Sequence, residues 1–334
     1  MHLFELTRRL IDIESITPNE GAVGDFLFEV LTALARRFNG VVERMPVEEG
    51  RPNVFASFGR PVVVLSTHMD TVPPFIPSRD DGDVIWGRGA CDTKGIIAAM
   101  ITAAERLLEA GQRNFGLLFV VGEERNSAGA LVASKNPRGS KFLINGEPTE
   151  NQLALGSKGA LRFEIVAEGK MAHSAYPELG ESAIEKLLNA LERIRRIPMP
   201  VDEVLGASTL NIGLIQGGRA PNVIADHATA EIFIRVVGDV SQVRHDVHAA
   251  AAPDAAANEI LMIPACRLGT MDGFRTTVVS FTSDIPTFNG TWGEPYLIGP
   301  GTIHVAHTAA EHIPKSQLEE SVHIYANLVK RLGR

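Results

Sequence analysis

A strand that is apolar on both faces ends abruptly in polar side chains within the segment VVVLSTHMDTVP, residues 62–73. Such a run, without alternation and rich in β-branched residues, is typical of an interior strand of a parallel sheet whose faces are both covered. Open α/β sheets usually bind their ligands at the carboxyl ends of these strands. Residues i and i+2 of a strand point to one side, so His68 and Asp70 are predicted to face the same way, which suits a metal-binding imidazole oriented by a carboxylate. This segment alone favours a simpler interpretation, a histidine that only ends a strand before two prolines.

Strand-like and helix-like segments alternate through the first half of the chain. Two amphipathic helices, split by Pro18, are expected at the N-terminus because apolar residues recur there at helical spacing. Alternation of strands and helices indicates an α/β fold with a mostly parallel sheet and helices on both faces. The expected strands are Val54–Ser57, Val62–Thr67, Leu117–Val121 and Phe142–Ile144, and the expected helices after the first two are Gly95–Ala110 and Ala128–Ser134.

The pattern changes at Ser157, where strand, helix, strand, strand, helix and strand follow one another. This β-α-β-β-α-β order is typical of the α+β ferredoxin-like unit, which is a complete small domain. The sequence therefore predicts a discontinuous α/β domain, residues 1–156 and 270–334, with a lid domain inserted in it, residues 157–269. After Gly269 the first domain is expected to resume with two core strands and a C-terminal helix, at Val278–Phe281, Tyr296–Ile298 and Leu318–Arg331.

Composition excludes several classes of protein. The chain has 334 residues, of which 45% are hydrophobic and 22% charged, as in ordinary globular proteins. Its net charge of −8, with no basic run, argues against a nucleic-acid surface. Charges interrupt residues 1–15 and the apolar runs are short, so neither a secretory signal nor a membrane span is expected. Cys91 and Cys266 are the only cysteines, which leaves no disulfide framework or Cys-rich zinc site and suggests a reducing cytoplasm.

Acidic residues and histidines gather where expected strands end and helices begin. Several carboxylate groups at one edge of a sheet repel one another unless cations hold them together. Oxygen and imidazole ligands without thiolate fit Zn²⁺, Co²⁺ or Mn²⁺, and five of these side chains hold two ions if one carboxylate bridges. Beside His68 and Asp70, the side chains are Asp92, Glu123, Glu124, Glu147, His304 and His307.

Seven motifs resemble, in order along the chain, the di-zinc aminoacylase and carboxypeptidase family, which includes acetylornithine deacetylase, succinyl-diaminopimelate desuccinylase and glutamate carboxypeptidase. The resemblance covers nearly the whole chain and implies two Zn²⁺ ions. One would be held by His68, Asp92 and Glu147, and the other by Asp92, Glu124 and His307, with Asp92 as the bridge. The motifs are HMDTVP, GRGACDTKG, GEE, GEPT, AHSAYPELGESAI, GGRAPNVIAD and GPG with AHT.

The same resemblance implies the other roles at the site. Asp70 matches the carboxylate that orients the first histidine ligand, and Glu123 matches the general base. In the lid, His173 matches a histidine that reaches the active site of a neighbouring subunit and stabilises the oxyanion. Asn222 and Arg235 match residues that hold the carboxylate of the substrate. The division of roles between the two adjacent glutamates rests on the resemblance alone.

Some residues keep a second interpretation. His304, three positions before the assigned ligand, is the alternative metal-binding histidine. His173 is flanked by Ser174 and Pro177 and could be a turn residue, and the lid arginine at 235 could simply pair with a nearby acid. Two departures from the family, Phe233 in place of an aspartate and Ala225 in place of a proline, affect the expected substrate pocket and leave the metal set intact.

The predicted activity is hydrolysis of the amide bond of an N-acyl amino acid, and Glu147 favours this deacylase and carboxypeptidase branch of the family. A carboxypeptidase or dipeptidase is the closest alternative, with small N-acyl amino acids or short peptides as substrates. A non-catalytic metal-dependent binding protein and a two-metal phosphatase are more distant alternatives. The resemblance also implies a homodimer formed through the lid, with no nucleic-acid or membrane partner.

Overall fold

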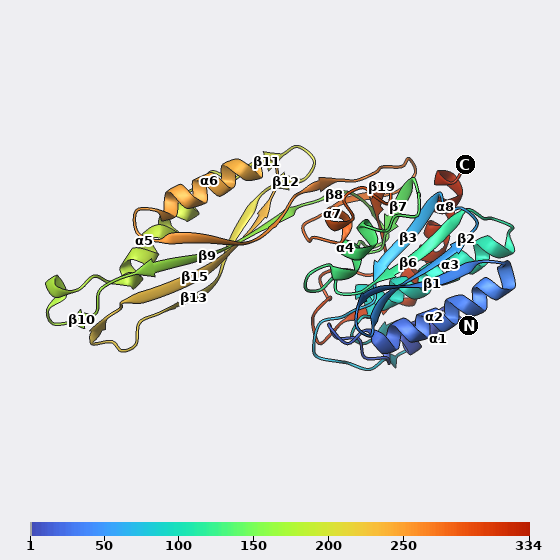
Figure 1. Ribbon diagram of the computed structural model, residues 1–334, viewed down its shortest axis with the longest axis horizontal. Helices are drawn as coiled ribbons and strands as arrows, with labels where there is room; N and C mark the ends of the chain where they lie inside the picture. The colour runs from blue at the N-terminus through green and yellow to red at the C-terminus, as the bar shows by residue number, and fades with distance from the viewer. Residues whose placement is uncertain (1) are drawn as a thin grey trace. The chain divides into compact units, whose positions relative to one another are not determined.

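The computed structural model describes residues 2–334, which form two compact units (Figure 1). The first unit contains the chain up to Leu155, together with Leu268–Thr277 and Ser283–Arg334. The second, which we call the inserted unit, contains Gly156–Arg267 and Val278–Thr282. None of the helices within residues 2–334 is both long and apolar enough to cross a membrane.

A six-stranded sheet forms the centre of the first unit, in the order β1-β2-β6-β3-β7-β19. The four strands β6, β3, β7 and β19 are mutually parallel, whereas β2 runs antiparallel to both of its neighbours. The predicted α/β class with a mostly parallel sheet is therefore confirmed. The strands are β1 (Val41–Glu48), β2 (Arg51–Phe58), β3 (Val63–His68), β6 (Phe115–Val120), β7 (Phe142–Asn145) and β19 (Glu294–Leu297).

Helices cover both faces of this sheet. Val63 and Leu65 of β3 belong to one apolar core with four helices, whereas Val64 belongs to a second core on the opposite face with two short helices and Trp292. Alternate residues of one strand thus bury on opposite sides, which explains why the run is apolar throughout. The first group is α1 (Leu3–Ile11), α2 (Gly21–Phe38), α3 (Gly95–Glu109) and α8 (Lys315–Leu332), and the second is α4 (Ala128–Ser134) and α7 (Ile285–Phe288).

The prediction of one core strand is wrong. Residues Val278–Phe281 do not join the central sheet; β18 (Thr276–Val279) belongs instead to a three-stranded sheet with β8 (Leu153–Ser157) and β17 (Cys266–Arg267). Only Val279 of β18 is buried, so the segment does not fill an interior position of a sheet. Residues 278–282 consequently lie with the inserted unit, whereas the sequence placed them in the first domain.

A small antiparallel sheet, β20-β5-β4, also belongs to the first unit. It pairs a segment near residue 85 with a segment near residue 313, which are far apart in the chain. Between β5 and α3 the chain makes one irregular turn, Ala90–Lys94, whose residues are all buried. The strands are β4 (Arg79–Asp80), β5 (Val84–Trp86) and β20 (His312–Pro314).

The inserted unit has the predicted β-α-β-β-α-β order, with the antiparallel sheet order β13-β15-β9-β16. Alternate residues of β9 and β15 are buried with both helices in a single apolar core. The main elements are β9 (Gly159–Glu168), α5 (Ala183–Arg195), β13 (Thr209–Gly217), β15 (His227–Val236), α6 (Val240–Ala251) and β16 (Ala256–Ile263). The minor strands are β10 (Ala172–His173), which pairs with β14 (Val223–Ile224), and β11 (Val201–Asp202), which pairs with β12 (Gly206–Ala207).

Candidate metal centre

Adjacent strands deliver the candidate ligands to one edge of the central sheet. Strand β3 ends at His68, its neighbour β6 leads into Glu123 and Glu124, and its other neighbour β7 leads into Glu147. Parallel neighbours end at the same edge, so these side chains are gathered by topology alone. Gly122, with a φ of 78°, makes the left-handed turn that starts the loop bearing the two glutamates.

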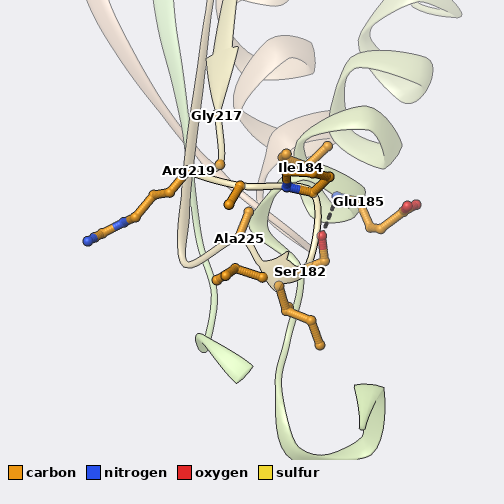
Figure 2. Close-up of a pocket in the computed structure, with 11 residues that line it drawn as sticks. Ser182, Ile184, Glu185, Gly217, Arg219 and Ala225 are labelled. Atoms are coloured by element: carbon orange, nitrogen blue, oxygen red, sulfur yellow. Dashed lines mark hydrogen bonds between the residues drawn. The ribbon is translucent and has the colours of Figure 1, made fainter. Parts of the chain in front are cut away.

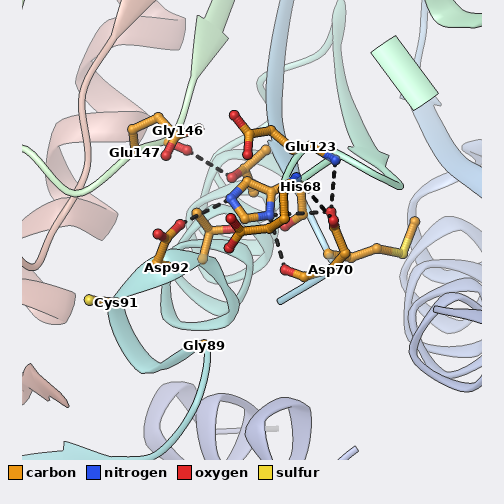
Figure 3. Close-up of polar contacts among 12 residues, drawn as sticks. His68, Asp70, Gly89, Cys91, Asp92, Glu123, Gly146 and Glu147 are labelled. Carbon is orange, nitrogen blue, oxygen red and sulfur yellow. Dashed lines mark hydrogen bonds and ion pairs between the residues drawn. The ribbon is translucent and has the colours of Figure 1, made fainter. Parts of the chain in front are cut away.

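Asp92 lies at the centre of the cluster and contacts two histidines with different oxygens. Its Oδ1 is 3.0 Å from His68 Nε2, and its Oδ2 is 3.3 Å from His307 Nε2 (Figure 3 shows the His68 side). His307 Nε2 is also 3.1 Å from Glu124 Oε1. One ligand atom each from His68, Asp92 and Glu124 lie within 4.8 Å of one another, close enough to hold a metal ion. A carboxylate with one oxygen toward each histidine is the arrangement that a bridging ligand requires.

The other two candidates differ in their placement. Glu147 is buried and accepts a long hydrogen bond of 3.5 Å from Asn145 Nδ2; like His307, it does not belong to the group within 4.8 Å. Figure 3 shows it on the same side of His68 as Asp92. His304 is exposed, and its backbone nitrogen donates a long hydrogen bond of 3.5 Å to Thr302 Oγ1, whereas its imidazole makes no hydrogen bond with residues 2–334. The geometry thus favours His307 over His304 as the metal-binding histidine.

Several side chains of this cluster have raised pKa values because carboxylates and imidazoles are buried close together. Burial raises the pKa of Glu123 and of Glu147 well above their ordinary values, and neighbouring carboxylates add to the effect. Burial alone disfavours protonated His68, but the carboxylates of Asp70 and Asp92 outweigh it and raise its pKa well above the ordinary value. Hydrogen bonds with Asp92 and Glu124 raise the pKa of His307 to about 10. In the chain alone, protons therefore occupy positions that metal ions could take, and the oxygen and nitrogen donors suit Zn²⁺, Co²⁺ or Mn²⁺.

Comparison with known proteins identifies the family. Residues 64–331 match the family model described as Peptidase family M20/M25/M40. The Peptidase M20 domain-containing protein C757.05c of Schizosaccharomyces pombe is 40% identical over 98% of this chain and 84% of its own length. The chain belongs to peptidase family M20/M25/M40. A probable carboxypeptidase of Aspergillus terreus is 39% identical over 97% of this M20 chain and 84% of its own length.

The fold of this M20 chain also has solved counterparts. The aminopeptidase PepT of Bacillus cereus superimposes with a TM-score of 0.81 over 99% of this chain and 98% of its own, at 20% sequence identity. At that identity the comparison supports the fold alone. The resemblance drawn from the sequence motifs is thus confirmed, and the M20 chain is a metallopeptidase-type hydrolase of peptide or amide bonds.

In this M20 chain, Asp70 contacts both His68 and the loop that carries Glu123 and Glu124. His68 Nδ1 donates to the backbone carbonyl of Asp70 at 3.0 Å, which leaves Nε2 as the ring nitrogen that faces Asp92. The Asp70 carboxylate also accepts hydrogen bonds of 3.1 Å from the backbone amides of Glu123 and Glu124. Asp70 therefore positions the loop of the predicted base as well as the first histidine, which Figure 3 makes visible.

Three residues near the centre were not predicted. Thr17 Oγ1 donates to Asp70 Oδ2 at 2.7 Å, and Glu311 contacts the loop that bears Asp92. Asp284 is buried, one of its oxygens has no hydrogen-bond partner among residues 2–334, and burial raises its pKa to about 7. Glu311 follows the AHT motif by three residues, whereas Thr17 and Asp284 belong to no recognised motif, and for all three only the tertiary structure shows what they contact.

The inserted unit carries the histidine predicted to stabilise the oxyanion and the residues predicted to bind the substrate. His173 is exposed in β10, where its Nδ1 accepts a 3.1 Å hydrogen bond from the amide of Ala175, a contact typical of a turn. Arg235 is half-buried, and burial lowers its pKa. Within residues 2–334 its Nη1 has no hydrogen-bond partner, and its guanidinium lies 4.7 Å from the centre of the Phe233 ring. The alternative that Arg235 pairs with a nearby acid therefore has no support.

Asn222 belongs to an exposed loop of the inserted unit. The loop follows β13 and borders a hollow beside the start of α5, where Ser182 Oγ accepts a hydrogen bond from the amide of Glu185 (Figure 2). In Figure 2, Arg219 of this loop extends away from α5. The loop that carries Asn222 is thus available at the surface, as a residue that contacts a ligand or a partner must be.

Proposed function

We propose that this M20 chain hydrolyses the amide bond that precedes a free α-carboxylate, as a carboxypeptidase does. The single observation that carries the proposal is the contact of Asp92 with both His68 and His307 beside two glutamates. The similarity to a probable carboxypeptidase over nearly the whole chain supports the substrate class.

Two divalent cations, Zn²⁺ in the first instance and Co²⁺ or Mn²⁺ otherwise, fit the donor set. We assign His68, Asp92 and Glu147 to one ion and Asp92, Glu124 and His307 to the other. When bound, such a pair lowers the pKa of a water molecule from 15.7 toward about 7 and polarises the carbonyl of the substrate.

Glu123 is the proposed general base. Its backbone amide donates to the Asp70 carboxylate, as does that of the proposed ligand Glu124, so Asp70 holds the loop that carries both glutamates. Glu123 takes a proton from the attacking water and then gives that proton to the leaving nitrogen of the substrate. The negative charge that develops on the carbonyl oxygen is stabilised in part by His173.

Arg235 and Asn222 are proposed to hold the substrate carboxylate. The Arg235 guanidinium has an unpaired nitrogen and a planar fork that binds both oxygens of a carboxylate. An aspartate two residues earlier would compete for this cation, whereas Phe233 only packs against it. The departure from the family at position 233 thus leaves the arginine free for the substrate.

A substrate panel tests the function. Dipeptides with a free carboxylate are expected to be cleaved about 10- to 100-fold more efficiently, measured as kcat/KM, than the same dipeptides with a C-terminal carboxamide, because a hydrogen bond to a charged group is lost. Arg235→Lys should reduce this preference, and Arg244→Lys, on α6, is the matched control. Equal hydrolysis of both substrate forms, or no hydrolysis by the metal-loaded protein, would contradict the proposal.

Deacylation of an N-acyl amino acid is the second candidate. The glutamate at position 147 is compatible with both activities, because it favours the branch of the family that contains deacylases and carboxypeptidases, and N-acyl amino acids present the same free carboxylate to Arg235. N-acetyl and N-succinyl amino acids in the same panel distinguish the two activities: a deacylase prefers them to dipeptides, and a carboxypeptidase does not. Family membership gives no support to the non-catalytic and phosphatase alternatives.

We further propose that the active form is a homodimer assembled through the inserted unit. Strand β13 is at the edge of its sheet, and its Leu214 and Ile215 side chains are 53% and 55% exposed. An edge strand with exposed apolar residues is a favourable surface for pairing with a second copy.

His173→Ala is expected to lower kcat by about 10²- to 10³-fold without loss of folded structure, because a donor to the oxyanion is removed. His245→Ala, an exposed histidine of α6, is the matched control. If His173 serves the partner subunit, mixing His173→Ala with Glu123→Gln subunits should recover about a quarter of wild-type activity, since half of the dimers then contain one complete site. No recovery after demonstrated subunit exchange would refute the shared site.

A further inference from the structure

Glu311 is a buried carboxylate that the proposed mechanism does not use. It follows His307 by four residues, and its side chain is 2% exposed. Its Oε2 pairs with Arg88, which is also 2% exposed. Its Oε1 accepts hydrogen bonds from the backbone amides of Gly89 at 2.9 Å and Asp92 at 3.3 Å.

All of these donors belong to the loop that ends at Asp92. The backbone carbonyl of Glu311 adds a further contact, because it accepts a 3.0 Å hydrogen bond from the amide of Gly87. Gly89 has a φ of 87°, a left-handed conformation that favours glycine and turns the chain sharply into the buried residues before α3. The loop is therefore shaped around the Glu311 carboxylate.

Paired strands lie next to this contact in both segments. Residues 312–314 of β20, directly after Glu311, pair with Trp86, Ile85 and Val84 of β5, directly before the loop. The segment that carries His307 and the loop that carries Asp92 are thus joined first by a strand ladder and then by Glu311. The same two segments meet again where Asp92 Oδ2 lies 3.3 Å from His307 Nε2.

We propose that Glu311 is a positioning residue that fixes Asp92 relative to His307 and thereby sets the affinity of the metal position formed by Asp92, Glu124 and His307. The proposal rests on the assignment of these three residues as ligands. A metal site tolerates only small errors in ligand position, since coordination distances vary by about 0.2 Å. Contacts beyond the ligands that orient them typically change metal affinity by about 10- to 100-fold when they are lost.

The chemistry of the contact explains why a carboxylate is needed. Glu311 meets donors on both oxygens, the Arg88 guanidinium on one and two backbone amides on the other. A glutamine of the same shape has one acceptor oxygen and an NH₂ group, so one set of donors must face another donor. Glu311→Gln therefore removes an acceptor with little change in volume.

The test is a metal titration of the metal-stripped protein, followed by the absorption spectrum of Co²⁺ and by competition of Zn²⁺ with a chelator. Glu311→Gln is expected to weaken binding at the position formed by Asp92, Glu124 and His307 by about 10- to 100-fold, seen as a loss of affinity for at least one of the two equivalents of metal. Glu20→Gln is the matched control, because Glu20 is a buried carboxylate that also pairs with an arginine, Arg51. It should lower the melting temperature without changing either metal affinity.

A purely structural role for Glu311 predicts a different result. In that case Glu311→Gln lowers the melting temperature as Glu20→Gln does and leaves both metal affinities and the Co²⁺ spectrum unchanged, which overturns the proposal. If Glu311→Gln does not fold, Arg88→Lys is the variant to measure, since it keeps the positive charge and loses the planar guanidinium. It should weaken at least one equivalent of metal, and unchanged binding of both equivalents overturns the proposal. A wild-type protein that binds no metal would instead overturn the proposed function itself.

Discussion

Glu123→Gln is expected to lower kcat by about 10²- to 10⁴-fold while the protein still binds two equivalents of divalent metal. The glutamine keeps the size of the side chain and removes its ability to accept and return a proton. Its backbone amide still donates to Asp70, so the neighbouring Glu124 should stay in place. The measurement combines steady-state kinetics on the best substrate of the panel with metal analysis of the same sample.

The control for this variant is Glu319→Gln, an exposed glutamate of α8 that should retain wild-type kcat. Loss of metal from Glu123→Gln would reassign the residue as a ligand and leave Glu124 as the candidate base. Wild-type turnover with both metals bound would remove Glu123 from the mechanism. The experiment therefore separates the two adjacent glutamates, which the sequence could assign only by resemblance.

Candidate ligands that directly follow a strand were predictable, because the strand pattern and the ligand lie next to each other in the sequence. His68 follows an apolar run whose length and composition require a buried strand, and Glu147 follows another. In a parallel sheet, both ends must lie at one edge. The fold class and the location of the centre therefore follow from local patterns and general rules of topology.

Residues that act from another part of the chain were not predictable in this way. Thr17 reaches Asp70 from the segment between α1 and α2, and Glu311 reaches the Asp92 loop from over two hundred positions later in the sequence. A single threonine or glutamate carries no periodic signal, and its partner is set only by packing. Strand β1 was missed for a related reason: only Met45 in it is buried, so it lacks the apolar run that marks an interior strand.

In the proposed metal centre, protons and metal ions compete for the same side chains. Glu124 and Asp92 raise the pKa of His307 to about 10, so in the metal-stripped protein this imidazole is protonated at neutral pH. His68 is shifted in the same direction. A metal ion binds only the neutral imidazole, and each histidine that becomes a ligand must therefore release its proton.

Metal affinity is consequently expected to rise steeply between pH 6 and pH 8, by about tenfold per pH unit for each proton released. Release of one proton from His307 gives an increase of about 10²-fold over this range for the ion held by Asp92, Glu124 and His307, measured by chelator competition with the protonation of the chelator taken into account. His304→Asn, at an exposed position outside the cluster, should show the same slope. An affinity that is independent of pH would show that neither imidazole is a ligand.

The stability of the metal-stripped protein should change with pH in the opposite direction. The pKa of His307 is higher in the folded chain than the ordinary value of 6.5, so its contribution to stability is complete below pH 6.5 and is lost as the pH rises toward about 10. Metal-loaded protein lacks this loss, because the ion takes the place of the proton between Asp92, Glu124 and His307. The difference in melting temperature between the two forms should therefore widen as the pH increases from 6.5, and scanning calorimetry of both forms measures it.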